Sequence, residues 1–230
     1  MSNVNLRTPG KFIVVEAPDG CGKSTLIKHL SSYLKKTSIP HIIVKEPSDL
    51  EIGSFVHKWV NSNGFMNDKF LNTEALFLFS AQRIELIENR ILPALQEGYL
   101  VLSDRFALST AVYQDLNPSH QLSALVKATL DNLSSFVNID ATLFLDLDPK
   151  IVMSRISGRP MNDTIDRGDL DFHTCLRMKY DILLSKYGDD IVPKNLKGEV
   201  IRLDATKSPE ALCSTAWTKI QEIWQNKINT

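Results

Sequence analysis

Residues 12–25 read F-I-V-V-E-A-P-D-G-C-G-K-S-T, and this stretch decides the fold of the chain. An apolar, β-branched run gives way to small residues and then to Gly-Lys-Ser, after which residues 26–34 have the apolar spacing of an amphipathic helix. This order predicts a strand, a phosphate-binding loop and a helix, because loop N–H groups and the positive end of the helix dipole converge on an anion. The loop residues expected to hold the phosphates of ATP are Asp19, Gly20, Cys21, Gly22, Lys23, Ser24 and Thr25.

Two side chains of this loop have a specific expected role. Lys23 can reach the β- and γ-phosphates of a nucleotide, and the Ser24 hydroxyl can ligate Mg²⁺. The full pattern G-x-x-x-x-G-K-S/T has glycine at position 17, where this chain has Ala17. Alanine fits without strain if φ is negative there, and poorly if the loop needs a conformation that only glycine tolerates. The alternative is a plain strand-to-helix turn with a surface lysine, which the flanking strand and helix patterns disfavour.

The composition is that of a globular protein. Of the 230 residues, 43% are hydrophobic and 23% are charged, and the formal net charge is −1, so no overall basic field favours nucleic acid as a partner. The apolar runs are too short to span a bilayer and no signal segment is recognisable, so we expect no membrane partner. Three widely spaced cysteines without metal-ligand spacing favour reduced thiols and a cytoplasmic location: Cys21, Cys175 and Cys213.

Strand and helix signals alternate along the chain. After the first strand, further strands are expected at residues 42–44, 99–104, 141–147 and 199–203, and long helices at 73–96 and 209–227. This alternation predicts a single α/β domain over residues 1–230, with a five-stranded parallel sheet covered by helices on both faces. In such sheets ligands bind beyond the carboxyl ends of the strands, where Pro18, Glu46, Asp104 and Asp148 are expected to gather.

The segment after the third strand carries the second strong signal. Residues 103–114 read S-D-R-F-A-L-S-T-A-V-Y-Q. An acid and an arginine at a strand end are costly to bury unless they face ligands or each other, so Asp104 could hold the water shell of a metal and Arg105 a phosphate. Thr110, Tyr113 and Gln114 share one face of a helix. The alternative is an ion-paired strand end that precedes an ordinary amphipathic helix.

Taken together, these segments resemble the thymidylate kinases, P-loop enzymes that phosphorylate dTMP with ATP. The resemblance extends over residues 11–223. The family's E-G-x-D-G-x-G-K-S/T-T matches residues 16–25, its L-L-F-x-A-x-R matches residues 76–83, and its D-R-Y/H-x-x-S-x-x-A-Y-Q matches residues 104–114. The resemblance implies the fold of the P-loop nucleoside monophosphate kinases, with ATP as phosphoryl donor, dTMP as acceptor and Mg²⁺ at Ser24 and Asp104.

The resemblance also implies a role for each residue of the acceptor site. Phe79 occupies the position that stacks on thymine and Arg83 the position that hydrogen-bonds the base, although without the resemblance an aromatic residue on a helix more often faces the core. Arg105 is implied to bind the acceptor phosphate, and Asp19 to lie near the sugar and phosphate. Thr110 and Gln114 are placed along the thymine edge and Tyr113 beneath the sugar. The other residues implied in substrate binding are Glu46, His57 and Asp104.

A lid is expected over about residues 157–168. This stretch is short of apolar side chains and rich in turn formers, which fits an exposed, movable segment, and the matching segment of the family is a mobile lid. Phosphoryl transfer needs positive charge at the moving group, and the phosphate loop carries no arginine, so the bacterial-type arrangement implies that the lid supplies it. The alternative is a solvated basic loop. The implied catalytic residues are Asp19, Lys23, Arg105, Arg159 and Arg167.

Further departures concern the acceptor site. The family pattern E-P-G-G-T-x-x-G-x-x-I-R appears at residues 46–57 with Ser48 and Asp49 in place of two glycines, and with His57 in place of the arginine that would grip the acceptor phosphate. Histidine is largely neutral at pH 7, and a neighbouring lysine is a point charge rather than a bidentate fork. We therefore hypothesise that acceptor binding is weaker or differently oriented. A second hypothesis is that alkylation of Cys21 blocks ATP binding.

The expected activity is transfer of the γ-phosphoryl group of Mg-ATP to dTMP, by a homodimer as is usual in the family. Another deoxynucleotide, such as dUMP or dGMP, stays open as acceptor because residues 48, 49 and 57 depart from the pattern. A guanine-nucleotide switch fits poorly, since Asp104-Arg105-Phe106 stands where D-x-x-G is required and N-K-x-D is absent. A non-catalytic nucleotide-binding protein is the third alternative, which the presence of Lys23 and Ser24 disfavours.

Overall fold

The first strand is apolar on both faces, and this requires cover on both sides. In β1 (Lys11–Glu16), the side chains of Phe12, Ile13, Val14 and Val15 are at most 1% exposed. A strand of this kind belongs in the interior of a parallel sheet with helices on each face. In the computed structural model, which describes residues 9–63, 69–114, 120–157 and 168–228, β1 is the central strand of five.

The five strands are parallel and lie in the order β2-β3-β1-β4-β5. The bounds of the other strands are His41–Lys45 (β2), Leu100–Asp104 (β3), Ala141–Asp146 (β4) and Glu199–Asp204 (β5). Val15 of β1 pairs with Asp104 of β3 and with Leu143 of β4, so the carboxyl ends of the strands meet at one edge. The expected α/β fold with five parallel strands is confirmed.

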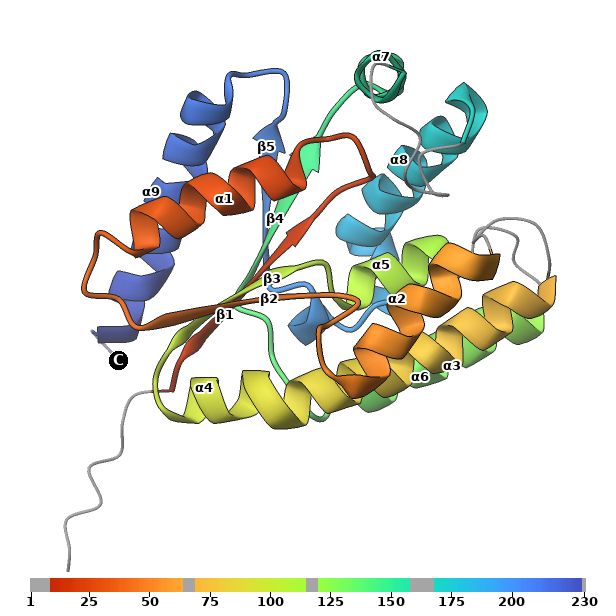
Figure 1. Cartoon of the computed structure of the whole chain (residues 1–230), viewed down its shortest axis with the longest axis horizontal. Helices are drawn as coiled ribbons and strands as arrows, with labels where there is room; N and C mark the ends of the chain where they lie inside the picture. Colours follow the sequence, from red (N-terminus) through yellow and green to blue (C-terminus); the bar gives the residue numbers. More distant parts are fainter. Residues whose placement is uncertain (1–8, 64–68, 115–119, 158–167, 229–230) are drawn as a thin grey trace, which may run out of the picture.

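Helices cover the two faces of the sheet in separate groups (Figure 1). α1 (Lys23–Leu34) and α9 (Pro209–Ile228) lie on one face, and α3 (Lys69–Leu86), α5 (Ala107–Tyr113), α6 (His120–Leu133) and α8 (Leu170–Leu184) lie on the other. Ile13 and Val15 belong to the core under the first group, and Phe12 and Val14 to the core under the second. Alternate residues of one strand therefore serve two separate cores.

The remaining elements refine the expected helices. They are α2 (Glu51–Asn63), which packs against α3, the π-helical turn η1 (Ile87–Ile91), α4 (Leu92–Gln96), α7 (Pro149–Ile156) and the 3₁₀ turns η3 (Lys186–Asp190) and η4 (Lys194–Leu196). The helix expected at residues 73–96 is a run of α3, η1 and α4 that starts at Lys69. The π turn was not expected, because apolar spacing does not separate it from an α-helix. None of the helices in the described ranges has the length and hydropathy that a bilayer crossing requires.

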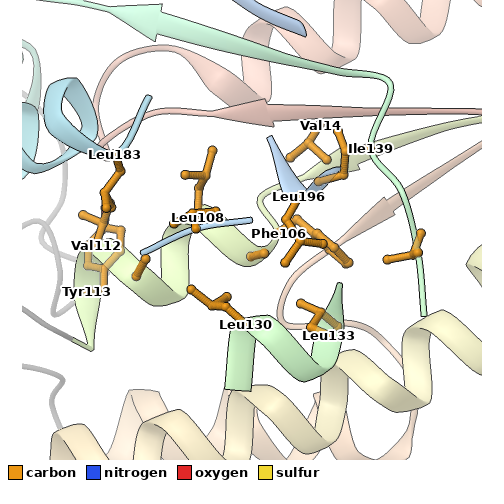
Figure 2. Close-up of a cluster of buried hydrophobic side chains, with 14 of the residues drawn as sticks. Val14, Phe106, Leu108, Val112, Tyr113, Leu130, Leu133, Ile139, Leu183 and Leu196 are labelled. Atoms are coloured by element: carbon orange, nitrogen blue, oxygen red, sulfur yellow. The ribbon is translucent and has the colours of Figure 1, made fainter. Parts of the chain in front are cut away.

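α5 has only seven residues, and burial holds it in place (Figure 2). Its side chains Leu108, Val112 and Tyr113 lie in a buried cluster that also contains Leu130 and Leu133 of α6. Because a helix this short is unstable by itself, its position comes from this packing. The packing of α5 therefore also fixes the position of the turn that links β3 to α5.

Candidate active site

The phosphate loop between β1 and α1 contains two left-handed glycines. Gly20 has φ +81° and Gly22 has φ +98°, values that residues with a side chain rarely adopt. Gly20 also lies close to α7, since a Cβ there would be 3.0 Å from the side chain of Ile156. Ala17 is fully buried, and Arg105 alone among the described non-glycine residues has a positive φ. The missing glycine at position 17 therefore causes no backbone strain.

Lys23 is buried inside this loop. Its ammonium group donates to the backbone carbonyls of Ala17 (3.1 Å) and Pro18 (3.3 Å) and to Oδ1 of Asp19 (3.3 Å). These three bonds use the three N–H groups of the ammonium, so a phosphate oxygen that binds Lys23 replaces at least one of them. The loop thus holds a cation next to the N-terminus of α1, where an anion is favoured.

Asp19 links the phosphate loop to the turn after β3. Its Oδ1 accepts hydrogen bonds from Lys23 and from the guanidinium of Arg105. Burial raises the pKa of this carboxyl, but the charges of Arg105 and Lys23 outweigh burial and hold the pKa well below its usual range. Asp19 is therefore an ionised bridge between two cations, at the point where β1 and β3 end.

Arg105 has a strained backbone. Its φ of +71° lies in the left-handed region, which costs about 1–3 kcal/mol in a residue other than glycine and persists only where the surroundings impose it. Its guanidinium donates to the carbonyl of Ala17 (3.1 Å) and to Oγ of Ser109 (3.0 Å), and lies 5.3 Å from the ring centre of Tyr113. Burial lowers the pKa of Arg105, but Asp19 foremost among its neighbours raises it well above the usual value. Arg105 is a fixed, permanent cation.

A pocket, called the central pocket below, opens between the phosphate loop, α2, α3 and α5. α3 contributes Phe79 and Arg83, which lie one turn apart, and α5 contributes Thr110 and Tyr113. It gathers nearly all the residues that the sequence predicted for the acceptor, although they span almost a hundred positions. The predicted residues that line it are Asp19, Glu46, His57, Phe79, Arg83, Arg105, Thr110, Tyr113 and Gln114.

A buried ion pair lies in the central pocket. Arg83 is 1% exposed, and it donates from Nε to Oε1 of Glu46 (2.8 Å) and from Nη2 to Oε2 (2.6 Å). It also donates to Oγ1 of Thr110 (2.9 Å) and to the carbonyl of Phe106 (3.3 Å). An arginine has five N–H donors, so these four bonds leave one for a ligand. A role for Arg83 in reading a base therefore depends on one N–H group.

A second cavity lies beside β2 and α1. Ser24 and Asp104 line it together with Lys45 and Asp49. Oδ1 of Asp104 is buried and has no hydrogen-bond partner in the described part of the chain. Hydroxyl and carboxylate oxygens suit Mg²⁺, which takes few protein ligands and completes its shell with water and phosphate, so these two residues fit the expected metal site. Asp104, which was also predicted to bind the acceptor, lines this cavity and not the central pocket.

The two predicted lid arginines, Arg159 and Arg167, lie outside the described residues. The next described helix, α8, is tied to the sheet, since Nε of Arg177 donates to Oδ1 of Asp146 at the end of β4 (2.9 Å). Asp148 lies beyond the same strand end, as expected, and its carboxylate caps the first turn of α7.

Some residues of the site were missed by the sequence reasoning. Val60 and Asn61 line the central pocket on the same helix as His57, and a helical spacing of three and four from His57 would have found them. Ser109, the third residue of α5, also lines the pocket, four positions after Arg105. Glu16 is fully buried beneath the pocket residues, and only its place at the end of an apolar strand hinted at this.

The side chain of Cys21 belongs to the apolar core and not to the phosphate-binding surface. It is buried among the side chains between the sheet and α1 and α9, and burial raises the pKa of its thiol to about 11. The hypothesis that alkylation of Cys21 blocks ATP binding required a thiol at the loop surface, whereas the thiol lies in the core; the effect of its alkylation on ATP binding stays a prediction. All three cysteines are free, and Cys175 is exposed whereas Cys213 is buried.

The fold and the loop define a P-loop nucleotide-binding protein, and comparison with known proteins gives its family. The sequence profile of the thymidylate kinase family matches residues 15–213. A thymidylate kinase of Blochmanniella pennsylvanica (strain BPEN) is 32% identical over 201 residues, 87% of this chain and 90% of that protein. One of Legionella pneumophila (strain Corby) is 30% identical over 219 residues, 95% and 98% of the two chains. One of Rickettsia typhi is 35% identical over 170 residues, 74% and 81% of the two chains. The chain belongs to the thymidylate kinase family.

The burial of two thiols predicts the order in which they react. We expect the native protein to react quickly with a thiol reagent such as DTNB at Cys175, and at Cys21 and Cys213 only after unfolding, because the thiolate is the reactive form and burial suppresses it. The Cys175→Ser variant should lose the fast phase. Fast labelling of Cys21 in that native variant would contradict the orientation described above.

Proposed function

We propose that this protein transfers the γ-phosphoryl group of ATP to dTMP, giving dTDP and ADP. The observation that carries the proposal is the contact between Asp19 and Arg105, which joins the phosphate loop to the central pocket. A donor phosphate on the loop and an acceptor phosphate at Arg105 would lie next to each other, which is the positioning that in-line transfer needs. The names of the relatives support dTMP as acceptor, since each is called a thymidylate kinase.

On the donor side, we propose that the backbone of residues 19–25 and the Lys23 ammonium bind the phosphates of ATP. Ser24 and Asp104 would hold Mg²⁺, which offsets the negative charge of the phosphates when it is bound. The support is the buried position of Lys23 beside the N-terminus of α1 and the unsatisfied Oδ1 of Asp104.

On the acceptor side, we propose that Arg105 binds the phosphate of dTMP and that Phe79 stacks on the base. The remaining N–H of Arg83, together with Gln114, would hydrogen-bond the base edge. The ion pair of Arg83 with Glu46 supports this assignment, because a guanidinium held by two parallel bonds presents its last donor in one direction. Stacking on a ring together with a rigid planar donor is a sound way to read a pyrimidine.

We also propose that Arg159 and Arg167 complete the site. The charge that develops on the transferred group needs cations, and residues 19–22 of the loop contain no arginine. Closure of an arginine-bearing segment would also exclude water from the transferred group. Alanine substitutions at both positions that leave kcat unchanged would contradict these roles.

A single domain and a cytoplasmic location are part of the proposal. One sheet, with a core on each face, includes strands from both halves of the chain, which supports one domain over residues 1–230. The three free cysteines support a reducing compartment. Detection of the protein in a soluble cytoplasmic fraction, and a single cooperative unfolding transition, are the corresponding measurements.

ADP release from Mg-ATP should depend on the acceptor. With dTMP, dUMP, dCMP, dGMP, AMP and water alone as acceptors, we expect turnover to be highest with dTMP. The Lys23→Ala variant is the control for contaminating kinases and should be inactive with each acceptor, because it lacks the cation at the phosphates. Preference for another nucleotide would be consistent with a kinase reaction but would contradict the proposal that the pocket recognises thymine. No turnover with any acceptor, despite ATP binding, would refute the proposed activity.

The position of His57 predicts a gain of acceptor binding on substitution. His57 lines the central pocket from α2, where its Nδ1 lies 3.3 Å from the side-chain amide of Asn61. A permanent, bidentate cation at this position should lower the KM for dTMP about tenfold in His57→Arg. Lys58→Arg is the matched control, because Lys58 is the exposed neighbour on the same helix and does not line the pocket. An unchanged KM in His57→Arg would contradict the proposal that the acceptor phosphate binds near His57.

The exposed apolar side chains of α2 and α3 predict a homodimer. Ile52, Phe55 and Phe77 are 37%, 54% and 57% exposed on two helices that pack against each other. Large exposed apolar side chains are common at contact surfaces between proteins, so Phe55→Ser combined with Phe77→Ser should convert a dimer to a monomer in analytical ultracentrifugation. Tyr187→Ser, at an exposed residue elsewhere, is the control and should stay dimeric. A monomeric wild type at micromolar concentration would contradict the homodimer.

A further inference from the structure

Glu16 is a buried carboxylate to which the proposed function gives no role. It ends β1 and is fully buried. Its Oε1 accepts from the backbone N–H groups of Phe106 (2.9 Å) and Ser109 (3.3 Å), and its Oε2 from the hydroxyls of Ser109 (2.8 Å) and Tyr180 (2.9 Å). Four donors converge on two oxygens, and a protonated acid would add a further hydrogen among them. Glu16 therefore acts as the common acceptor of this group.

The hydroxyl of Ser109 connects this carboxylate to Arg105. Nη1 of Arg105 donates to Oγ of Ser109 at 3.0 Å. A guanidinium can only donate and a carboxylate can only accept, so the hydroxyl between them has one orientation. It accepts from Arg105 and donates to Glu16. This chain of bonds fixes one edge of the guanidinium, and Asp19 holds another edge by accepting from Nη2.

Glu16 also holds the backbone of the residue that follows Arg105. The N–H of Arg105 donates to the carbonyl of Val15 (3.0 Å), and the next N–H, of Phe106, donates to Glu16. The strained φ of +71° at Arg105 therefore lies between two anchors that both belong to the end of β1. Phe106 precedes α5 and supplies no side-chain cap, so Glu16 accepts the N–H of Ser109 in the first turn of that helix in its place.

We propose that Glu16 is the positioning residue of Arg105. By holding both the strained turn and the Ser109 hydroxyl, it directs the guanidinium into the central pocket, where the acceptor phosphate binds. This inference rests on the proposed function, in which Arg105 binds that phosphate. Glu16 itself does not line the pocket, so it acts through Arg105 and not by touching the substrate.

Tyr180 provides an internal control for this inference. Its hydroxyl donates to the same oxygen of Glu16 as Ser109 does, and lies 3.3 Å from Oγ of Ser109, but it is not hydrogen-bonded to Arg105 in the described structure. Burial, followed by the charge of Glu16, raises the pKa of Tyr180 well above its usual value, so Tyr180 stays a donor. Removal of this hydroxyl takes one bond from Glu16 and leaves the route to Arg105 in place.

The test compares Glu16→Gln, Ser109→Ala and Tyr180→Phe in the full chain. In Glu16→Gln the amide oxygen can still accept from the backbone, whereas the NH₂ group cannot accept from the Ser109 hydroxyl. We expect both Glu16→Gln and Ser109→Ala to raise the Kd and KM for dTMP about tenfold, with the KM for ATP within about twofold of the wild-type value. Tyr180→Phe should lower the melting temperature and leave the Kd and KM for dTMP within about twofold.

The outcomes separate positioning from a merely structural role. If Glu16→Gln and Ser109→Ala lower only the melting temperature or the active fraction, with the Kd and KM for dTMP unchanged, the inference is wrong. The inference is also wrong if Tyr180→Phe weakens the binding of dTMP as strongly as Ser109→Ala does. If Glu16→Gln does not fold, Ser109→Ala decides alone. Failure of the wild type to phosphorylate dTMP would instead refute the proposed function, so the two failures are distinguishable.

Discussion

Every side chain of β1 from Phe12 to Glu16 is buried, and this burial sets where charge can appear in the molecule. Apolar side chains on both faces require helices on both faces, so no ligand can reach the middle of the sheet. Polar groups collect where the strands stop, at Glu16 of β1 and Asp104 of β3. The phosphate loop, the Arg105 turn and the central pocket all begin at this edge. The chemistry of the site thus follows from a packing requirement of one strand.

Charge pairing is the second constraint on the site, because unpaired charge at this depth is costly. Three carboxylates and three cations occupy the region, and each carboxylate accepts from a cation or from a set of hydrogen-bond donors: Glu16, Asp19, Glu46, Lys23, Arg83 and Arg105. The hydrogen bonds of the cluster hold the cations in place without a ligand. Removal of one member would leave a partner unpaired, so the cluster behaves as a unit and its members are not energetically independent.

Two consecutive residues, Asp104 and Arg105, divide the site between its two cavities. Asp104 lines the cavity with Ser24, and Arg105 lines the central pocket. This division depends on the left-handed φ at Arg105, which redirects the chain as β3 ends. The strained turn between Asp104 and Arg105 therefore keeps the two cavities close together and on separate sides of one chain segment. The core beneath α5 provides the rigidity that such strain requires (Figure 2).

The sequence alone determined the succession of strands and helices along the chain and the phosphate loop, because local apolar patterns and a short motif encode them. Most residues of the central pocket were implied by the resemblance to the thymidylate kinases and not by local pattern. It also implied Arg83 as a base reader. The tertiary structure decided what each side chain is bonded to: it placed four of the five Arg83 donors on Glu46, Thr110 and Phe106, and turned the Cys21 thiol into the core. Those facts depend on residues distant in sequence that meet only when the sheet closes, so no local pattern carries them.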